Sequence, residues 1–288
     1  MKLKFSAFDI LLYLILCAIT LSALYPFIYM IAVSLSGTVP VLKGEVFLWP
    51  KQFNLNTYAA VFDNPAIGRA YLNTILYTVL GTTISLLITA AGAYSLSKPE
   101  MLFRKTFMVM VVITLFFSGG MIPTFLVVRS YDLLDTIWAM VLPGAISTWN
   151  LIVMRTFFSA MPQEVEESGK IDGLTEIGIF FRLVLPLSKA ILATIGLFYG
   201  VAIWNNFFSA LLYLRDADLF PLQVIVRNMV LQGAGGANGA SNVGGDSLIV
   251  DESLKYATII VTTVPILLVY PFLQKHFAKG ALIGSVKG

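Results

Sequence analysis

The sequence contains long apolar windows, free of charged residues, that are separated by charged segments. Six such windows cover residues 10–42, 70–97, 106–128, 136–154, 190–214 and 256–274. A helix that crosses a bilayer needs about 20 apolar residues, so these windows predict spans at about 10–33, 70–96, 106–128, 136–155, 190–214 and 256–275. The predicted fold is all-α, a polytopic membrane protein with six transmembrane helices in a single transmembrane domain over residues 1–288. A seventh charge-free stretch, 228–245, is too polar to span, and its residues 233–247 are predicted to form a flexible loop.

Composition agrees with membrane insertion and removes several kinds of chemistry. Hydrophobic residues make up 58% of the chain and charged residues 12%, whereas about 25% charged residues is usual in soluble domains. One cysteine, Cys17, and one histidine, His276, exclude an intrachain disulfide and a multi-histidine metal site. Gly169-Lys170 lacks the upstream glycine and the following Ser or Thr of a Walker A loop. A net charge of +3 is too small and scattered for a nucleic-acid binder.

The distribution of Lys and Arg predicts the orientation in the membrane. With the N-terminus inside, 12 of the 19 Lys and Arg residues fall in cytoplasmic segments and 7 in outer segments. Positive charges favour the cytoplasmic side, so both termini are predicted to be cytoplasmic in a multi-pass plasma membrane protein. The outer segments are then about 34–69, 129–135 and 215–255. The cytoplasmic segment 155–189 is too long for a simple turn.

This cytoplasmic loop, residues 159–189, has the pattern of two short helices. Pro162 suits a first helical turn, and the acidic residues that follow favour a helix N-terminus. Gly169 and Asp172-Gly173 interrupt the run, Asp172 is expected to cap the second helix, and Pro186 is expected to end it. Within that helix one apolar face is predicted, formed by Ile177, Phe180, Phe181 and Val184. Periodicity alone leaves two interpretations equally open: a solvated acidic loop followed by an interfacial amphipathic helix without a specific function, or a loop that carries the function of the protein.

The spacing in this loop resembles the cytoplasmic signature of binding-protein-dependent ABC importer permeases. That pattern is Glu-Ala-Ala, three residues, Gly, nine residues, Ile, one residue, Leu-Pro. Here 167–169 reads Glu-Ser-Gly, and Gly173, Leu183, Leu185 and Pro186 follow without insertion or deletion. Asn73-Thr74, the run 90–97 and the stretch 204–207 resemble features of the carbohydrate-uptake, maltose-type permeases. The stretch 117–124 resembles a subgroup for alginate- or pectin-derived oligosaccharides.

The resemblance implies a coupling helix that docks on a separate ATPase subunit. Glu164 and Glu167 would pair with basic groups of the ATPase, and Gly173 would let the two short helices meet at a sharp angle. Gly169 is expected to loosen the first helix. The implied partners are a second homologous permease subunit, two ATPase subunits, an extracytoplasmic sugar-binding protein and the lipid bilayer. ATP and Mg would be bound by the ATPases, and no cofactor is expected in this chain, which is not itself an enzyme.

Polar and aromatic residues within spans are candidates for a sugar path, because polar groups in a membrane mark functional sites. The candidates are Tyr199, Trp204, Asn205, Asn206, Trp149 and Asn150. Aromatic rings suit sugar C–H faces and amides suit hydroxyls. Other roles compete with sugar binding. Trp and Tyr also anchor spans at the membrane interfaces, and Asn also forms hydrogen bonds between neighbouring helices. On a continuous helix the consecutive residues 204–206 would fan over about 200°, so either Asn205 and Asn206 border the path or Trp204 does with Asn205 beside it.

Three alternatives compete with a sugar importer subunit. An ABC permease for a non-sugar solute keeps the partners, although an anionic cargo would call for basic residues within the spans, and the six windows hold none. A secondary transporter that works without an ATPase would show inverted repeats with broken helices. An intramembrane enzyme would need a nucleophile with a base, or metal ligands.

Overall fold

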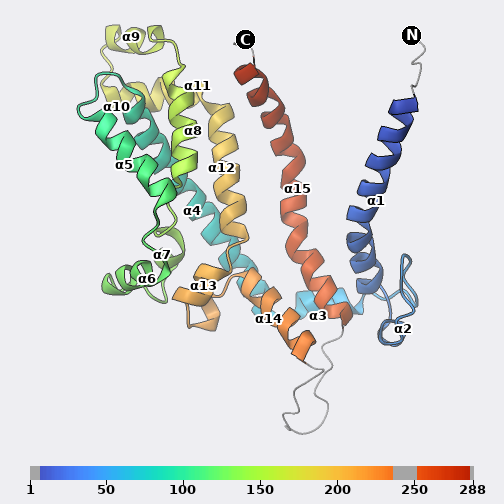
Figure 1. The fold of residues 1–288 in the computed structure, drawn as a ribbon. Coiled ribbons are helices and arrows are strands. Elements are labelled where there is room, and N and C mark those ends of the chain that lie inside the picture. Colours follow the sequence, from blue (N-terminus) through green and yellow to red (C-terminus); the bar gives the residue numbers. More distant parts are fainter. Residues whose placement is uncertain (1–6, 236–251, 286–288) are drawn as a thin grey trace. The chain divides into compact units, whose positions relative to one another are not determined.

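The computed structural model describes residues 7–235 and 252–285, and all regular structure in these ranges is helical (Figure 1). The helices are α1 (Ala7–Ser34), α2 (Thr38–Leu42), α3 (Asn56–Asp63), α4 (Pro65–Ser97), α5 (Arg104–Phe116), α6 (Met121–Ser130), α7 (Ile137–Val141), α8 (Thr148–Ser159), α9 (Glu164–Ile171), α10 (Glu176–Ile179), the π-helical turn η1 (Phe180–Val184), α11 (Leu185–Leu187), α12 (Lys189–Trp204), α13 (Phe208–Tyr213), the 3₁₀ turn η2 (Ala217–Leu219), α14 (Leu222–Gly235) and α15 (Glu252–Ser285). The predicted flexible loop over 233–247 lies outside the described residues, apart from 233–235 at the end of α14. The all-α prediction is confirmed for the described ranges.

The chain divides into two compact units. Unit 1 comprises Met1–Gly68 and Ile225–Val264, and unit 2 comprises Arg69–Val224 and Pro265–Gly288. A small core in unit 1 joins the end of α1 to the segment after it, with Val33, Val41 and Val46 buried and Tyr29 and Tyr256 packed against them. Unit 2 contains the predicted coupling loop and the predicted path residues.

Within residues 7–235 and 252–285, two helices are long and apolar enough to cross a membrane without a break, Phe8–Ser34 and Pro65–Ser97. The number rises to four among the described residues when two bent helix pairs are each counted as one span. The predicted spans 10–33 and 70–96 correspond to these unbroken helices. The count of six spans stays a prediction.

Three of the predicted spans are interrupted, contrary to the expectation of continuous helices. The window 106–128 contains α5 and α6, which bend by 115° at residues 117–120, where Gly120 has a left-handed φ of +86°. The window 136–154 is divided into α7 and α8, with Pro143-Gly144 between them. The window 190–214 is divided at 205–207 between α12 and α13. Because glycine and proline interrupt helices whatever the hydrophobicity around them, charge-free length alone did not reveal the first two breaks. The third break falls at the uncharged polar pair Asn205-Asn206.

A turn at residues 215–222 contacts the N-terminal half of α4, and we name it the outer turn after the predicted orientation. The Asn73 amide donates to the carbonyl oxygens of Asp218 and Phe220, at 2.7 and 3.2 Å. The buried Thr74 hydroxyl accepts from the backbone N–H of Leu222 at 2.8 Å. The Asn73-Thr74 pair, noticed in the sequence as a resemblance, therefore supplies hydrogen bonds to backbone groups that helices do not satisfy.

Two further contacts hold the outer turn. The Tyr77 hydroxyl donates to the Leu219 carbonyl at 2.8 Å. On the other side, the Asp135 carboxylate accepts from the backbone N–H groups of Arg215 and Asp216. These two hydrogen bonds lower the pKa of Asp135, because they favour its charged form. The outer turn is thus fixed between α4 and the segment that precedes α7.

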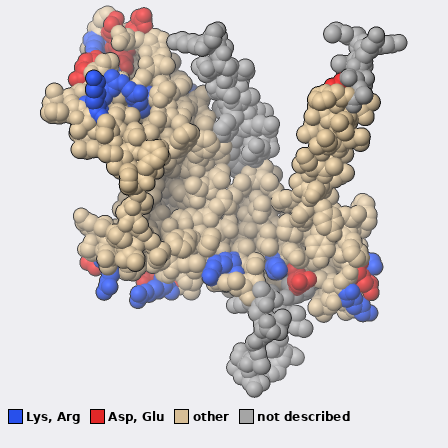
Figure 2. All heavy atoms as spheres, viewed as in Figure 1, with Lys and Arg blue, Asp and Glu red and all other residues tan. Residues whose placement is uncertain are grey.

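Charged side chains of unit 2 gather at two ends in Figure 2, over α9 and at the opposite end near α6 and α13. The surface between these ends is uncharged in this view. Charges cost several kcal/mol at the centre of a bilayer, so this arrangement suits a unit whose middle lies in lipid or against another apolar subunit.

Replacing Thr74 by valine is expected to destabilise unit 2. The change keeps the shape of the side chain but leaves the buried Leu222 N–H without its acceptor, which costs about 1–3 kcal/mol. Thr83→Val is the matched control, because the exposed Thr83 hydroxyl bonds only to Val79 of its own helix. Thermal unfolding of the detergent-purified importer should show a lower melting temperature for Thr74→Val alone. Equal melting temperatures in the two variants would contradict the role of Thr74 in holding the outer turn against α4.

Candidate functional site

The predicted coupling loop folds as two short helices joined by a tight turn. Gly173 has φ +75°, a left-handed conformation that favours glycine, and it lies two residues after the end of α9. Thr175 begins the next helix, and its hydroxyl accepts from the Gly178 N–H at 3.2 Å. Asp172 is the C-terminal cap of α9, so the expectation that Asp172 caps the second helix is wrong: the two residues after Gly173 place Thr175 at that position instead.

Gly169 lies where α9 meets the second helix. A Cβ atom at this position would come within 2.8 Å of the side chains of Ile179 and Leu183. The residue is buried, so its lack of a side chain permits close packing of the two helices. The expectation that Gly169 loosens α9 does not describe this contact, in which the glycine brings α9 against its neighbour.

The second helix continues past Pro186, which was expected to end it. It runs from Glu176 through η1 and α11 to Leu187, and the chain bends by 84° before α12 begins at Lys189. A proline ring clashes with the preceding turn of a regular α-helix, and the wider π-helical turn of η1 comes directly before it. The break therefore falls at Ser188.

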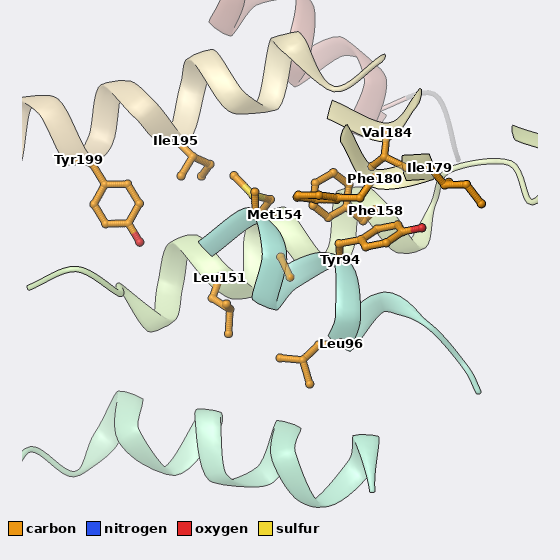
Figure 3. Close-up of a cluster of buried hydrophobic side chains, with 12 residues drawn as sticks. Tyr94, Leu96, Leu151, Met154, Phe158, Ile179, Phe180, Val184, Ile195 and Tyr199 are labelled. Carbon is orange, nitrogen blue, oxygen red and sulfur yellow. The ribbon is translucent and has the colours of Figure 1, made fainter. Parts of the chain in front are cut away.

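A buried aromatic cluster lies beneath the loop (Figure 3). Phe180 packs on Tyr94 of α4, with ring centroids 5.1 Å apart. Tyr94 in turn meets Phe158 of α8 edge to face at 6.1 Å. Ile179 and Val184 are fully buried in the same cluster, which fastens the second helix of the loop to α4 and α8.

The predicted apolar face of that helix was partly wrong. Phe180 and Val184 are buried, but Ile177 and Phe181 are exposed. The buried face is formed by Ile179, Phe180, Leu183 and Val184, because the π-helical turn alters the register expected for a regular helix. Ile177 and Phe181 consequently point away from the core.

The acidic residues of α9 divide into two groups. Glu166 forms an ion pair with Lys98, at the end of α4, and both side chains are largely buried. Glu164 and Glu167 are exposed and form no ion pair within the described part of the chain. Lys98 was missed from the sequence, because it is separated from α9 by two predicted spans.

The last turn of α4 also binds two arginines. The Leu96 carbonyl accepts from the Nε atoms of Arg104 and Arg155, at 3.1 and 3.3 Å. Cations at a helix C-terminus interact favourably with its partial negative charge. The C-terminal end of α4, the start of α5 and the C-terminal half of α8 are joined at this carbonyl.

Among the predicted path residues, Tyr199 and Asn150 are buried. The Tyr199 hydroxyl bonds to Thr89 of α4 at 2.7 Å and accepts from the Ser147 N–H at 2.9 Å. The Tyr199 hydroxyl is therefore hydrogen-bonded to two groups of the protein, and its observed contacts join three segments of unit 2. Trp149 is exposed on α8.

Residues 204–206 do not lie on one helix, contrary to the expected fan. Trp204 ends α12, Asn205 follows as its cap, and the Asn205 amide donates to the Val201 carbonyl at 2.9 Å. Asn206 exchanges two hydrogen bonds with Ser209, at 2.9 and 3.1 Å, and so stabilises the start of α13. The two amides are engaged in ending one helix and starting the next.

Trp204 lines a cavity of about 540 Å³ in unit 2. The cavity is lined by Thr78, Val79, Thr82 and Thr83 of α4, by Ala193, Gly196, Leu197, Gly200, Val201 and Trp204 of α12, and by Pro265 and Ile266 of α15. Among the described residues, the buried Trp204 Nε1 and the hydroxyls of Thr78 and Thr82 have no hydrogen-bond partner. The sequence reasoning found Trp204 but missed the threonines, although their i, i+4 spacing places both on one face of α4.

Metal chemistry has no ligand set in the described residues. No group of three or more His, Cys, Asp or Glu side chains in residues 7–235 and 252–285 is arranged to hold an ion. The cavity offers apolar surface, hydroxyls and one indole N–H, which suit the binding of a small molecule. The acidic helix α9 suits docking on another protein.

Comparison with known proteins identifies the family. Residues 99–282 match the family described as "Binding-protein-dependent transport system inner membrane component", which is more than half of the chain. The polygalacturonan/rhamnogalacturonan transport system permease protein YtcP of Bacillus subtilis (strain 168) is 45% identical, over 99% of this chain and 100% of that protein. Protein LplC of the same organism is 45% identical, over 98% of this chain and 95% of that protein.

A solved structure agrees with the fold. It is the crystal structure of a bacterial ABC transporter involved in the import of the acidic polysaccharide alginate, with a TM-score of 0.85, 33% identity and coverage of 96% of this chain and 100% of that chain. The resemblance inferred from the signature loop is confirmed, and so is the resemblance to the alginate- and pectin-type subgroup. The chain therefore belongs to the binding-protein-dependent transport system inner membrane components: it is a membrane permease subunit of an ABC importer, which works with ATPase and substrate-binding partners, and ATP hydrolysis takes place on the separate ATPase subunits.

Proposed function

We propose that this permease conducts oligosaccharide fragments of polysaccharides across the plasma membrane, with uronic-acid fragments as its cargo. The observation that carries this proposal is the match, over nearly the whole chain, to a polygalacturonan/rhamnogalacturonan permease and to an importer of alginate. The matches give no support to a non-sugar solute or to a transporter without an ATPase. The uncharged spans do not oppose an acidic cargo, because a flexible oligosaccharide can keep its carboxylates hydrated while its ring faces contact the protein.

The cavity beside Trp204 is the part of this chain that best suits a sugar. An indole ring offers an apolar face and one N–H donor, and this donor has no partner among the described residues. Trp204 is only 8% exposed, and its ring meets Tyr71 edge to face at 6.0 Å. Of the two arrangements that the sequence left open, this geometry favours Trp204 in the path, since the amides of Asn205 and Asn206 are already bonded.

Replacing Trp204 by phenylalanine tests the path and the cargo together. The variant keeps a ring but loses the indole donor, and one lost hydrogen bond of about 1 kcal/mol lowers affinity about fivefold. Uptake of oligogalacturonate or oligoalginate by the complete importer should fall about fivefold below saturation, with melting temperature unchanged. Trp138→Phe on α7 is the control. Wild-type uptake of both fragments by Trp204→Phe would remove Trp204 from the path, and absence of uptake by the wild-type importer would refute the cargo.

We also propose that α9 is the coupling helix that docks on the ATPase. Its exposed acids Glu164 and Glu167 are free of internal ion pairs in the described residues, and Ile171 beside them is 85% exposed. Ile177 and Phe181 add apolar surface on the adjoining helix. An exposed apolar group bordered by charges is typical of a protein interface. Two ATPases and a second permease subunit, with a binding protein on segments 34–69 and 215–255, complete the proposed assembly.

Glu167→Lys is expected to weaken ATPase docking without unfolding the permease. Reversing one charge of an interfacial pair costs at least about 1.4 kcal/mol, which corresponds to about tenfold in affinity. Pull-down of the permease from membranes should recover correspondingly less ATPase. Asp63→Lys, an equal charge change at the end of α3, should leave recovery unaltered. Normal ATPase recovery and normal uptake with Glu167→Lys would refute the docking role of this face.

The same proposal places α9 in the cytoplasm, with both termini on that side. In a Cys17→Ser background, Ser130→Cys should react with an impermeant thiol reagent in intact cells, and Ser168→Cys only after permeabilisation. Both positions are exposed. Labelling of the Ser168→Cys variant in intact cells would reverse the orientation and exclude docking of α9 on a cytoplasmic ATPase.

A further inference from the structure

The inner end of α4 carries the most deeply buried ion pair among the described residues. Lys98 follows the last residue of α4, and its ammonium contacts the Glu166 carboxylate of α9. The two side chains are 18% and 22% exposed, whereas the Lys170–Glu176 pair on the same loop is 54% and 59% exposed. Exposed pairs contribute little to stability, while removing one partner of a buried pair leaves an uncompensated charge.

The surroundings hold the Lys98 ammonium in one place. It lies 4.2 Å above the centroid of the Tyr94 ring, a geometry in which a cation is attracted to the aromatic face. Burial lowers the pKa of Lys98, and the nearby carboxylates of Glu176 and Glu100 act in the opposite direction. The ammonium is therefore fixed by a ring of its own helix, a carboxylate of α9 and further acidic groups around it.

Tyr94 links this pair to the second helix of the loop. One face of its ring receives Lys98, and the ring also packs against Phe180 of η1. Both helices of the loop are thus attached to the same turn of α4, one through charge and the other through aromatic packing.

The opposite end of α4 is attached to the outer turn through Asn73, Thr74 and Tyr77. Between Asn73 and Lys98 the helix is unbroken, so the two attachments are about 37 Å apart at 1.5 Å rise per residue. A continuous helix with its backbone hydrogen bonds intact moves as a rigid rod over this length, unlike the three interrupted spans.

We propose that the Lys98–Glu166 pair fastens α9 to α4, so that α9 and α4 move as one body and carry ATPase movement to the outer turn. This inference rests on the proposed docking of the ATPase on α9. Lys98 and Glu166 are positioning residues: neither touches cargo, and they act through the helix they hold. The alternative is that the pair opens and closes during each transport cycle. The two behaviours differ in what happens when Lys98 and Glu166 are replaced by a covalent cross-link.

A reversible cross-link distinguishes the two behaviours. In a Cys17→Ser importer whose other subunits lack cysteine, Lys98→Cys and Glu166→Cys are joined by a flexible bis-methanethiosulfonate linker as long as the two side chains replaced. If α9 and α4 move as one body, the linked importer keeps its uptake and its ratio of sugar imported to ATP hydrolysed, and reductant, which removes the link, lowers that ratio. Loss of uptake on linking, restored by reductant, would overturn the proposal.

Charge variants test whether the pair serves coupling or folding alone. Glu166→Gln and Lys98→Met should each lower the sugar imported per ATP hydrolysed at least about twofold, since residues in one ion-pair network are energetically coupled. Lys98→Glu combined with Glu166→Lys should recover most of that ratio. Lys170→Met is the matched control, because the Lys170 side chain on the same helix is 54% exposed. An unchanged ratio in Glu166→Gln and Lys98→Met would overturn the proposal.

Recovery of ATPase with each purified variant separates this inference from the proposed function. A wild-type permease that binds its ATPase elsewhere than on α9 would refute the docking role itself. Normal ATPase recovery in Glu166→Gln, together with a lowered transport-to-hydrolysis ratio, is the result expected of a link inside the permease. If Glu166→Gln recovers ATPase normally and its transport-to-hydrolysis ratio is unchanged, the proposed link between α9 and α4 is refuted, whereas the proposed docking of the ATPase is not affected.

Discussion

The absence of water in a bilayer obliges a crossing chain to satisfy its own backbone hydrogen bonds, and the rest of this structure depends on how α4 meets that constraint. α4 does so as one unbroken helix. The interrupted segments need side chains at their breaks: Asn206 and Ser209 bond after α12, and Ser147 accepts from Asn150 at the start of α8. Each break is therefore closed locally, and α4 is left as the straight element to which the others attach.

The acidic residues of α9 have two uses, one inside the permease and one toward the basic groups of the proposed ATPase partner. Within α9, Glu166 is used internally, whereas Glu164 and Glu167 face outward. Three acids within one helical turn can serve both purposes because positions three apart share a face, while the residue between them points elsewhere. An α9 with only outward acids would lack its attachment to α4, and one with only inward acids would present no charge to a neighbour.

The sequence predicted the features that depend on spacing and could not predict those that depend on contacts between distant segments. The unbroken spans, the turn at Gly173 and the family follow from charge-free length and from motif spacing. The breaks at 117–120, 142–147 and 205–207 do not, because the chain stays free of charged residues across them. Glu166 is indistinguishable from Glu164 until the fold brings Lys98 beside it, and the burial of Phe180 but not Phe181 depends on a π-helical turn that no simple periodicity contains.

Side-chain hydrogen bonds between α4 and α12 are unevenly distributed along the contact of the two helices. Toward the C-terminus of α4, Thr89 bonds to Tyr199. Along the middle, the buried Thr78, Thr82 and Ser85 hydroxyls have no partner among the described residues, and a Cβ at Gly200 would lie 3.5 Å from the Thr82 hydroxyl. Unpaired buried hydroxyls cost about 1–3 kcal/mol each. The helices can therefore separate at their middle without losing a side-chain hydrogen bond, and water or sugar hydroxyls entering there would satisfy groups that the closed contact leaves unpaired.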